Sequence, residues 1–285
     1  MDRQMEISVV GEGDVTTEIL YLQRDTKWEH EQPYEMRYQA KEDFPFTNAA
    51  HEARTVNIRD FRAVQGAQNY EDYGFSIANT ECPLTPSEFA DDNKVESMFY
   101  PVARRLLEKM FPDAAEIRIL EHTFRKRDVQ FLGESDNGFD TIQPATAVHI
   151  DYSPRSVVRL ASAFDIDPGK YTRFSTVNVW KSVQGPGNDW PLGLCDRRTI
   201  HHESEAIAAD VVFPNRYIEN MRLYSSPRHA WYYVKDLKDD ECIVFHQLDS
   251  DGTGGVAHAS FRNPKSDHDA APRASIELRA YLFYA

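Results

Sequence analysis

The sequence has few cysteines and no paired cysteine motif. Cys82, Cys195 and Cys242 lie far apart, and no Cys-x-x-Cys pair is present. This spacing excludes the common thiolate zinc sites, and the odd number disfavours a disulfide framework. We therefore expect a protein of a reducing compartment, and place it in the cytoplasm.

The sequence also lacks long hydrophobic runs and an excess of positive charge. No stretch approaches the ~20 apolar residues needed to span a bilayer. Residues 1–6 lack the basic start and apolar run of a secretory signal. The net charge of −14 would repel the phosphates of nucleic acids and anionic lipids. We expect neither a nucleic-acid nor a membrane partner.

What the chain does contain is enough apolar material for a large core. Hydrophobic residues make up 41% of the 285 residues, and aromatic residues 12%. We find no internal repeat and no low-complexity segment, so we expect a single domain over residues 1–285. Residues 1–80 are interpreted as a strand-rich N-terminal extension and 81–285 as the core. The polar stretch 23–43, with its scattered aromatic residues, is compatible with a homodimer contact.

The core contains one clear helix followed by short strands. Thr85 and Glu88 form the Thr-x-x-Glu pattern of a capping box, and apolar residues recur with helical spacing from Val95 onward. This predicts a helix over 85–111, kinked or divided at Pro101. The second half shows about seven short β-prone segments separated by loops. The fold class that follows is mainly β, a double-stranded β-helix (jelly roll) with flanking helices.

One of these strands carries a candidate metal site. In the segment Val148–Tyr152, His149 and Asp151 are two residues apart. Side chains alternate between faces along a strand, so this imidazole and this carboxylate point the same way. A further histidine would complete a 2-His-1-carboxylate set, which leaves coordination positions open on Fe(II) for a co-substrate and dioxygen.

The third ligand has to come from well downstream. His258 follows a glycine-containing loop and begins a β-prone segment, so it is the preferred candidate. His246 is the rival. The adjacent pair His201 and His202 points to opposite faces if extended, so it offers at most one ligand.

A 2-oxo acid bound to such an iron needs a cation for its distal carboxylate. Arg273 and Ser275 share one face of the C-terminal strand, where guanidinium and hydroxyl can bind one carboxylate together. Arg279 has the same parity and is the alternative. Asn178 is a candidate for a hydrogen bond to the oxo acid or to a metal ligand.

Several motifs together resemble a known family of Fe(II)/2-oxoglutarate-dependent oxygenases of the jelly-roll class. The similarity covers about residues 70–285, and is to the fungal hydroxylase/desaturase family named after the aspergillic acid pathway enzyme. That family includes gibberellin-desaturase-like proteins and a bacterial cephalosporin-methoxylation component. The motifs that carry it are the ordered ligand and anchor residues already described, the Asn178–Lys181 run with Gly185-Pro186, Asp189–Leu192, Leu194–Asp196, Trp231–Tyr233, Asp249-Ser250, His258–Phe261 and Pro272–Arg279.

The resemblance implies Fe(II) on His149, Asp151 and His258, with 2-oxoglutarate and O2 as co-substrates. It implies hydroxylation, desaturation or a related oxidation, including peroxidation, of an apolar secondary-metabolite intermediate such as a terpenoid, meroterpenoid or polyketide. Arg273 lies further from His258 than in many relatives of the wider class, so Arg279 stays open as the anchor. An aromatic pocket for this small-molecule substrate is expected from Tyr152, Phe124, Phe131, Trp180, Trp190 and Trp231.

Two alternatives share the same ligands. One is a jelly-roll metalloenzyme of the cupin type that does not use 2-oxoglutarate. The other is a catalytically inactive relative that binds a metabolite or stabilises a partner enzyme. The presence of all three candidate ligands and of the arginine disfavours the inactive relative.

Overall fold

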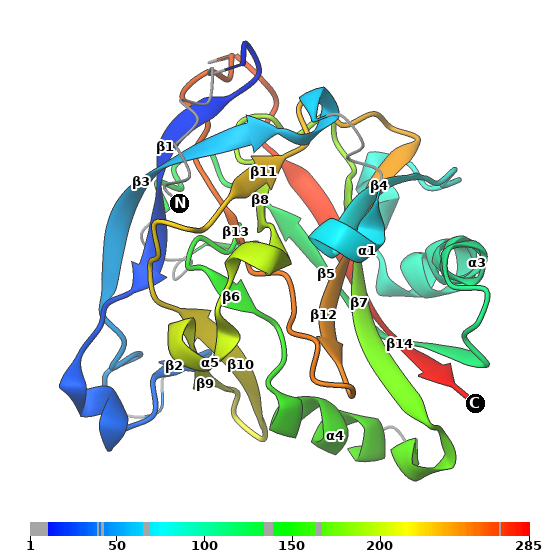
Figure 1. Cartoon of the computed structure of the whole chain (residues 1–285). Helices are drawn as coiled ribbons and strands as arrows, with labels where there is room; N and C mark the ends of the chain where they lie inside the picture. The colour runs from blue at the N-terminus through cyan, green and yellow to red at the C-terminus, as the bar shows by residue number, and fades with distance from the viewer. Residues whose placement is uncertain are drawn as a thin grey trace, which may run out of the picture.

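Two sheets dominate the computed structural model, which describes residues 11–38, 40, 43–64, 69–133, 139–163, 167–267 and 269–285 (Figure 1). The strands within these ranges are β1 (Val15–Leu22), β2 (Tyr34–Met36), β3 (His51–Asp60), β4 (Phe75–Asn79), β5 (Glu116–Lys126), β6 (His149–Ile150), β7 (Arg173–Ser182), β8 (Leu192–Cys195), β9 (Ala206–Val212), β10 (Tyr217–Leu223), β11 (Trp231–Tyr233), β12 (Glu241–Asp249), β13 (His258–Ser260) and β14 (Ala274–Tyr284).

Among these described strands, nine form one sheet and five form the other. The nine-stranded sheet has the order β1-β3-β11-β8-β13-β6-β10-β9-β2, and the five-stranded sheet has the order β4-β12-β7-β14-β5. The two curled sheets face each other, as in a jelly roll. The predicted fold class is confirmed.

The described helices are short and lie outside the sheets. They are α1 (Tyr70–Tyr73), α2 (Asp92–Lys94), α3 (Tyr100–Met110), α4 (Pro154–Ala163) and α5 (His202–Glu205), with 3-10 turns at Thr26–Glu29, Phe61–Ala63, Pro86–Ala90, Pro168–Lys170 and Arg197–Thr199. The helix predicted over 85–111 is divided: a 3-10 turn, α2 and a π-helical turn at Val95–Phe99 precede α3. Pro101 lies in the first turn of α3, directly after the π-helical turn.

The N-terminal segment contributes directly to the larger sheet. All of β1 pairs antiparallel with β3, and the end of β3 pairs in parallel with β11. The backbone N–H of Val148 donates to the carbonyl of Leu20 at 2.8 Å, next to β6. β2 adds to the far end of the sheet beside β9. The described strands before residue 61 thus belong to the same sheet as the candidate metal ligands, while the division into an extension over 1–80 and a core over 81–285 stays a prediction.

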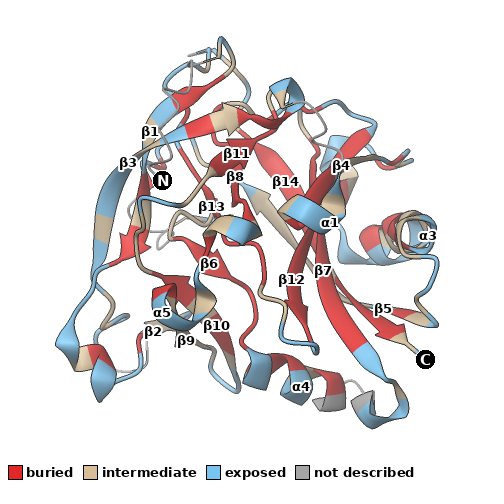
Figure 2. Cartoon of the chain, viewed as in Figure 1, coloured by how far each residue is buried: buried red, intermediate tan, exposed pale blue. Residues whose placement is uncertain are grey.

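The central strands of the five-stranded sheet, β7, β12 and β14, are buried on both faces, as their colouring in Figure 2 shows. On the outer face of this sheet, α3 and the preceding π-helical turn pack against apolar side chains of β7 and β14, including Val177, Val179 and Leu278. On its inner face, the alternate residues face the nine-stranded sheet. The strands can be buried throughout because both faces are covered.

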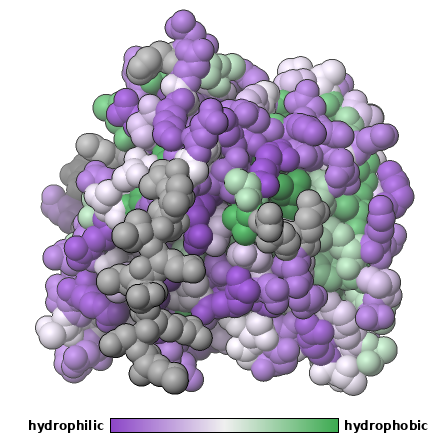
Figure 3. All heavy atoms as spheres, turned by 45° about the horizontal axis from the view of Figure 1, so that its top comes forward, coloured by the Kyte–Doolittle hydropathy of each residue, from purple (hydrophilic) through white to green (hydrophobic). Residues whose placement is uncertain are grey.

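The surface is mostly polar on the side that Figure 3 shows, with a smaller hydrophobic region right of centre. Among the described residues, no helix is both long and apolar enough to cross a membrane.

Candidate metal centre and its cavity

Two neighbouring strands of the larger sheet, β6 and β13, bring the candidate ligands together. β6 is only two residues long, and Asp151 directly follows it. His149 lies opposite His258 of β13, and on its other side opposite Arg222 of β10. Cross-strand partners present their side chains on the same face, so the two imidazoles are neighbours although they are far apart in sequence.

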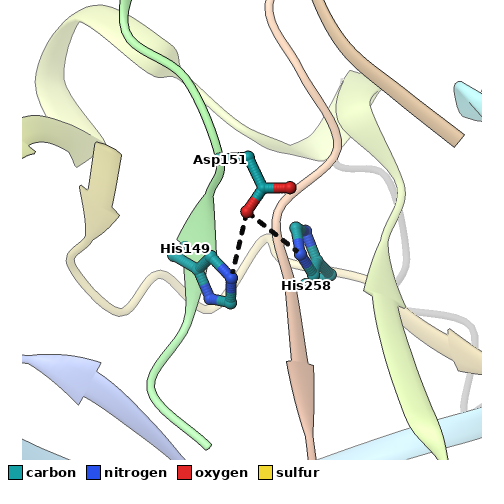
Figure 4. A group of neighbouring side chains, drawn as sticks. All are labelled: His149, Asp151 and His258. Carbon is teal, nitrogen blue, oxygen red and sulfur yellow. Dashed lines mark ion pairs between the residues drawn. The ribbon is translucent and has the colours of Figure 1, made fainter. Parts of the chain in front are cut away.

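The three donor atoms converge (Figure 4). His149 Nε2 lies 3.5 Å from Asp151 Oδ1, and His258 Nε2 lies 3.9 Å from the same oxygen. The two imidazole centroids are 4.3 Å apart. All three donor atoms lie within 4.8 Å of one another, and all three residues are buried. Two imidazole nitrogens and one carboxylate oxygen at these separations match a facial 2-His-1-carboxylate set.

Each histidine is oriented through its other ring nitrogen. His149 Nδ1 lies 2.8 Å from the carbonyl oxygen of Ala147, and His258 Nδ1 lies 3.2 Å from that of Val256. A carbonyl accepts only, so Nδ1 carries the proton and Nε2 offers its lone pair to the site. Burial, reinforced by His258, lowers the pKa of His149 to about 4. His149 is therefore neutral near pH 7, the state in which imidazole binds metals.

Asp151 is held by three partners. Its backbone N–H donates to Gln247 Oε1 at 2.7 Å, while Oδ2 accepts from Asn178 Nδ2 at 2.6 Å and from Arg279 Nε at 2.9 Å. These contacts leave Oδ1 facing the histidines. Burial alone would raise the pKa of Asp151, but Arg279 together with His149 and His258 outweighs burial and holds that pKa well below the usual range.

The guanidinium of Arg279 contacts three carboxylates, including that of the candidate ligand Asp151. Besides Asp151, its Nη2 bonds Glu277 at 2.5 Å, and its Nη1 approaches Glu121 at 3.4 Å. Asn178 lies opposite Arg279 on the neighbouring strand and also bonds Asp151. The contacts of Arg279 and Asn178 are thus with a candidate ligand. This arrangement favours Arg273 over Arg279 as the anchor of an oxo acid.

Arg273 and Ser275 lie at the other end of the inner face. Arg273 Nη1 donates to the carbonyl of Trp190 and to Ser260 Oγ, both at 2.7 Å. Its Nε and the hydroxyl of Ser275 are buried without a hydrogen-bond partner. Ser260 is two residues beyond His258 on the same face, so Arg273 contacts β13 about 6.6 Å along the strand from that candidate ligand.

The other histidines considered lie elsewhere. His246 is in the five-stranded sheet, and its Nε2 is 3.5 Å from the carbonyl of Thr253. His202 Nε2 lies 3.0 Å from the carbonyl of Gly255. Gly255 itself is required before β13, since a Cβ there would lie 2.0 Å from the carbonyl oxygen of Gln247. His201 bonds Ser204 at the start of α5.

A cavity of about 700 Å³ opens beside the ligands. His149, Asp151 and Tyr152 line it, as does Phe131. Trp190 packs on Phe131 with ring centroids 5.1 Å apart. Tyr152, Phe131 and Trp190 are therefore at or next to the expected pocket.

The remaining expected pocket aromatics are not among the residues that line this cavity. Phe124 lies opposite Ile276 and packs with the outer-face core. Trp180 is in another apolar cluster, with the Arg273 guanidinium 5.4 Å above its ring. Trp231 is buried in the larger sheet, where its Nε1 donates to Tyr21 at 2.8 Å. None of these three lines the cavity. Phe124 lies on the outer face of its sheet, whereas Trp180 lies on the inner face opposite Glu277, next to Arg273.

Charged and amide groups near the metal ligands were missed by the sequence reasoning. Arg222, Asn220 and Glu35 line the cavity, and Arg222 bonds Glu35 at 2.6 Å. Gln247 is fully buried and links Asp151 to the loop before β13. Its Oε1 accepts from the backbone N–H of Asp151, and its Nε2 donates to the carbonyl of Val256 at 3.2 Å. Polar residues inside otherwise apolar strands were the available signal for Gln247 and Asn220.

Fold and site together define the class: a jelly-roll Fe(II)/2-oxoglutarate-dependent oxygenase. Within it, the chain belongs to the family described as oxidoreductase/YMDC permease-like domain, whose model matches residues 19–283.

Known proteins similar to the chain are fungal enzymes. It is 28% identical to the hydroxylase/desaturase CTB9 of Cercospora beticola over 82% of this chain and 78% of that protein. It is 27% identical to the alpha-ketoglutarate-dependent dioxygenase tstK of Talaromyces stipitatus, over 80% and 84% respectively. Among solved structures, the iron and alpha-ketoglutarate-dependent endoperoxidase NvfI superposes with a TM-score of 0.81. The two are 23% identical, with 96% of this chain and 100% of that chain covered.

Proposed function

We propose that this chain is a non-haem Fe(II)/2-oxoglutarate-dependent dioxygenase that oxidises a C–H bond of a small secondary-metabolite intermediate. The observation that carries the proposal is the convergence of His149 Nε2, Asp151 Oδ1 and His258 Nε2, beside a cavity that the first two residues line. The names of the similar fungal proteins, a hydroxylase/desaturase and an alpha-ketoglutarate-dependent dioxygenase, support the same chemistry. They favour it over the cupin-type and inactive alternatives.

The residues present fit the iron. His149, Asp151 and His258 would hold it, and the second oxygen of Asp151 is already occupied by Asn178 and Arg279. The carboxylate therefore presents one oxygen to the metal. When bound, iron and 2-oxoglutarate supply the oxidant for hydroxylation, desaturation or a related oxidation.

The chain's own contribution is orientation and exclusion of water. Backbone carbonyls fix both imidazole rings, and Gln247 fixes the backbone of Asp151. Arg273 and Ser275 supply unpaired donors for the distal carboxylate of the oxo acid. The cavity volume of about 700 Å³ suits a substrate of several fused rings, with Tyr152 and Phe131 on its wall.

Anaerobic titration tests the proposal. A weak visible absorption band is expected only when both Fe(II) and 2-oxoglutarate are present, because the oxo acid must chelate the iron. The His258→Ala variant should lose the band and bind less than about a tenth of the iron bound by the native chain. His246→Asn, a matched change at a buried histidine outside the cluster, should keep both. Succinate release by His258→Ala at the native rate would contradict the assignment.

A further inference from the structure

A second, half-buried arginine lies beside the expected oxo-acid anchor. Arg125 of β5 is the register partner of Ser275 on β14, and the backbone N–H of Arg127 donates to the carbonyl of Arg273 at 2.9 Å. Register partners share a face, so Arg125 projects from the inner face of the sheet together with Ser275. Residues 273 and 275 have the same parity. The three side chains therefore belong to one patch.

The patch is rich in donors, and Glu277, the acid whose charge acts on both arginines, is paired with Arg279 instead. Arg125 Nη1 donates to the carbonyl of Gln143 at 2.8 Å, and Arg273 Nη1 bonds two neutral oxygens. Among the described residues, neither guanidinium forms an ion pair. Glu277, next along this face of β14, is bonded to Arg279. Arg273 Nε and Ser275 Oγ have no partner at all, although both residues are 1% exposed.

Two guanidinium groups that share one largely buried patch without an ion-pair partner are unfavourable unless an anion joins them. Burial lowers the pKa of both arginines, and Arg125 also lowers that of Arg273, to about 9. Arg125 lines the cavity, whereas Arg273 is not among its lining residues. An anion in the cavity beside the metal ligands would therefore meet Arg125.

We propose that Arg125 is a specificity-determining residue, which binds the distal carboxylate of 2-oxoglutarate together with Arg273 and Ser275. The inference depends on the proposed function. Two cations and a hydroxyl on one carboxylate make the site selective for a dicarboxylic oxo acid over a monocarboxylic one, because only the former neutralises the patch.

The test compares two oxo acids on the Fe(II) protein without oxygen. 2-Oxoglutarate and 2-oxopentanoate chelate iron through the same atoms and have the same chain length, but only the first has a distal carboxylate. Arg125→Met should weaken 2-oxoglutarate binding about 10–100-fold, the value of a charge-assisted contact. Binding of 2-oxopentanoate should change little, and Arg125→Lys should recover part of the loss.

Arg216→Met is the matched control, since Arg216 lines the same cavity but its side chain is 53% exposed. It should leave both dissociation constants unchanged. Iron affinity and the thermal melt of each variant report folding. Equal weakening of both acids by Arg125→Met, or no weakening of 2-oxoglutarate, would overturn the proposal; a change confined to substrate-stimulated succinate release would also overturn it, by making Arg125 a substrate contact. If the native protein shows no 2-oxoglutarate-dependent band, the proposed function itself has failed.

Discussion

The two faces of strand β14 bury residues of opposite character. Ile276, Leu278 and Leu282 point outward into the apolar layer beneath α3 and are fully buried. Ser275, Glu277 and Arg279 point inward, and are also largely shielded from solvent. Burial on the outer face is stabilising by itself. Burial on the inner face is tolerated because each charge is paired or awaits a ligand.

The two faces of this one strand therefore serve different purposes, one the stability of the fold and the other the binding of ligands. The outer face should govern the free energy of unfolding, and the inner face should govern metal and co-substrate affinity. Adjacent residues 278 and 279 allow a direct test, because they lie on the same backbone and differ in the face they occupy.

The largest effect is expected on the outer face. Leu278→Ala removes a fully buried side chain from the layer between β14 and α3, leaving a cavity. The free energy of unfolding should fall by about 2–5 kcal/mol. Denaturant unfolding measures the loss, and iron titration of the folded variant should give the native affinity. A large change in iron affinity would break the separation of the two faces.

An intermediate effect is expected one residue further along. Arg279→Met removes the charged partner of Asp151 Oδ2, so the carboxylate is less well oriented and less stabilised as an anion. Iron affinity should fall about 10–100-fold, the usual consequence of losing a residue that supports a metal ligand. Competition with a chelator measures it. Native iron affinity in a folded Arg279→Met protein would show that Asn178 alone holds Asp151.

The smallest effect concerns pH. His246 lies opposite Val177 on the five-stranded sheet, and burial lowers its pKa to about 4. The unfolded chain takes up a proton at His246 near pH 6.5 but the folded chain does not, so stability falls as pH decreases between these values. Between about pH 6.5 and pH 5, His246 should lower the free energy of unfolding by about 1.5 kcal/mol.

Denaturant unfolding of the iron-free protein at several pH values checks this. His246→Asn should show a flatter dependence of stability on pH than the native chain, by that amount. The other buried histidines contribute in the same direction to both proteins and cancel in the difference. An identical slope in the two proteins would mean that His246 is protonated in the folded state.

Part of the site could be predicted because it depends only on local geometry. The two-residue spacing of His149 and Asp151 places them on one side of an extended chain in any strand. The preference for His258 over His246 came from the glycine loop before it, and the close contact of Gly255 with Gln247 gives that loop its physical reason. The choice between Arg273 and Arg279 was beyond the sequence, because both have the same parity and only their distance from Asp151 distinguishes them.

The sequence by itself determined the class of fold, the spacing of the first two ligands and the parity of the C-terminal strand, since these follow from local periodicity. Only the tertiary structure decided which sheet face meets the metal, which aromatic residues line the cavity, and that Arg125 lies next to Ser275. These depend on pairing between strands far apart in sequence, and the hydrophobic periodicity of one strand does not identify the strand with which it pairs.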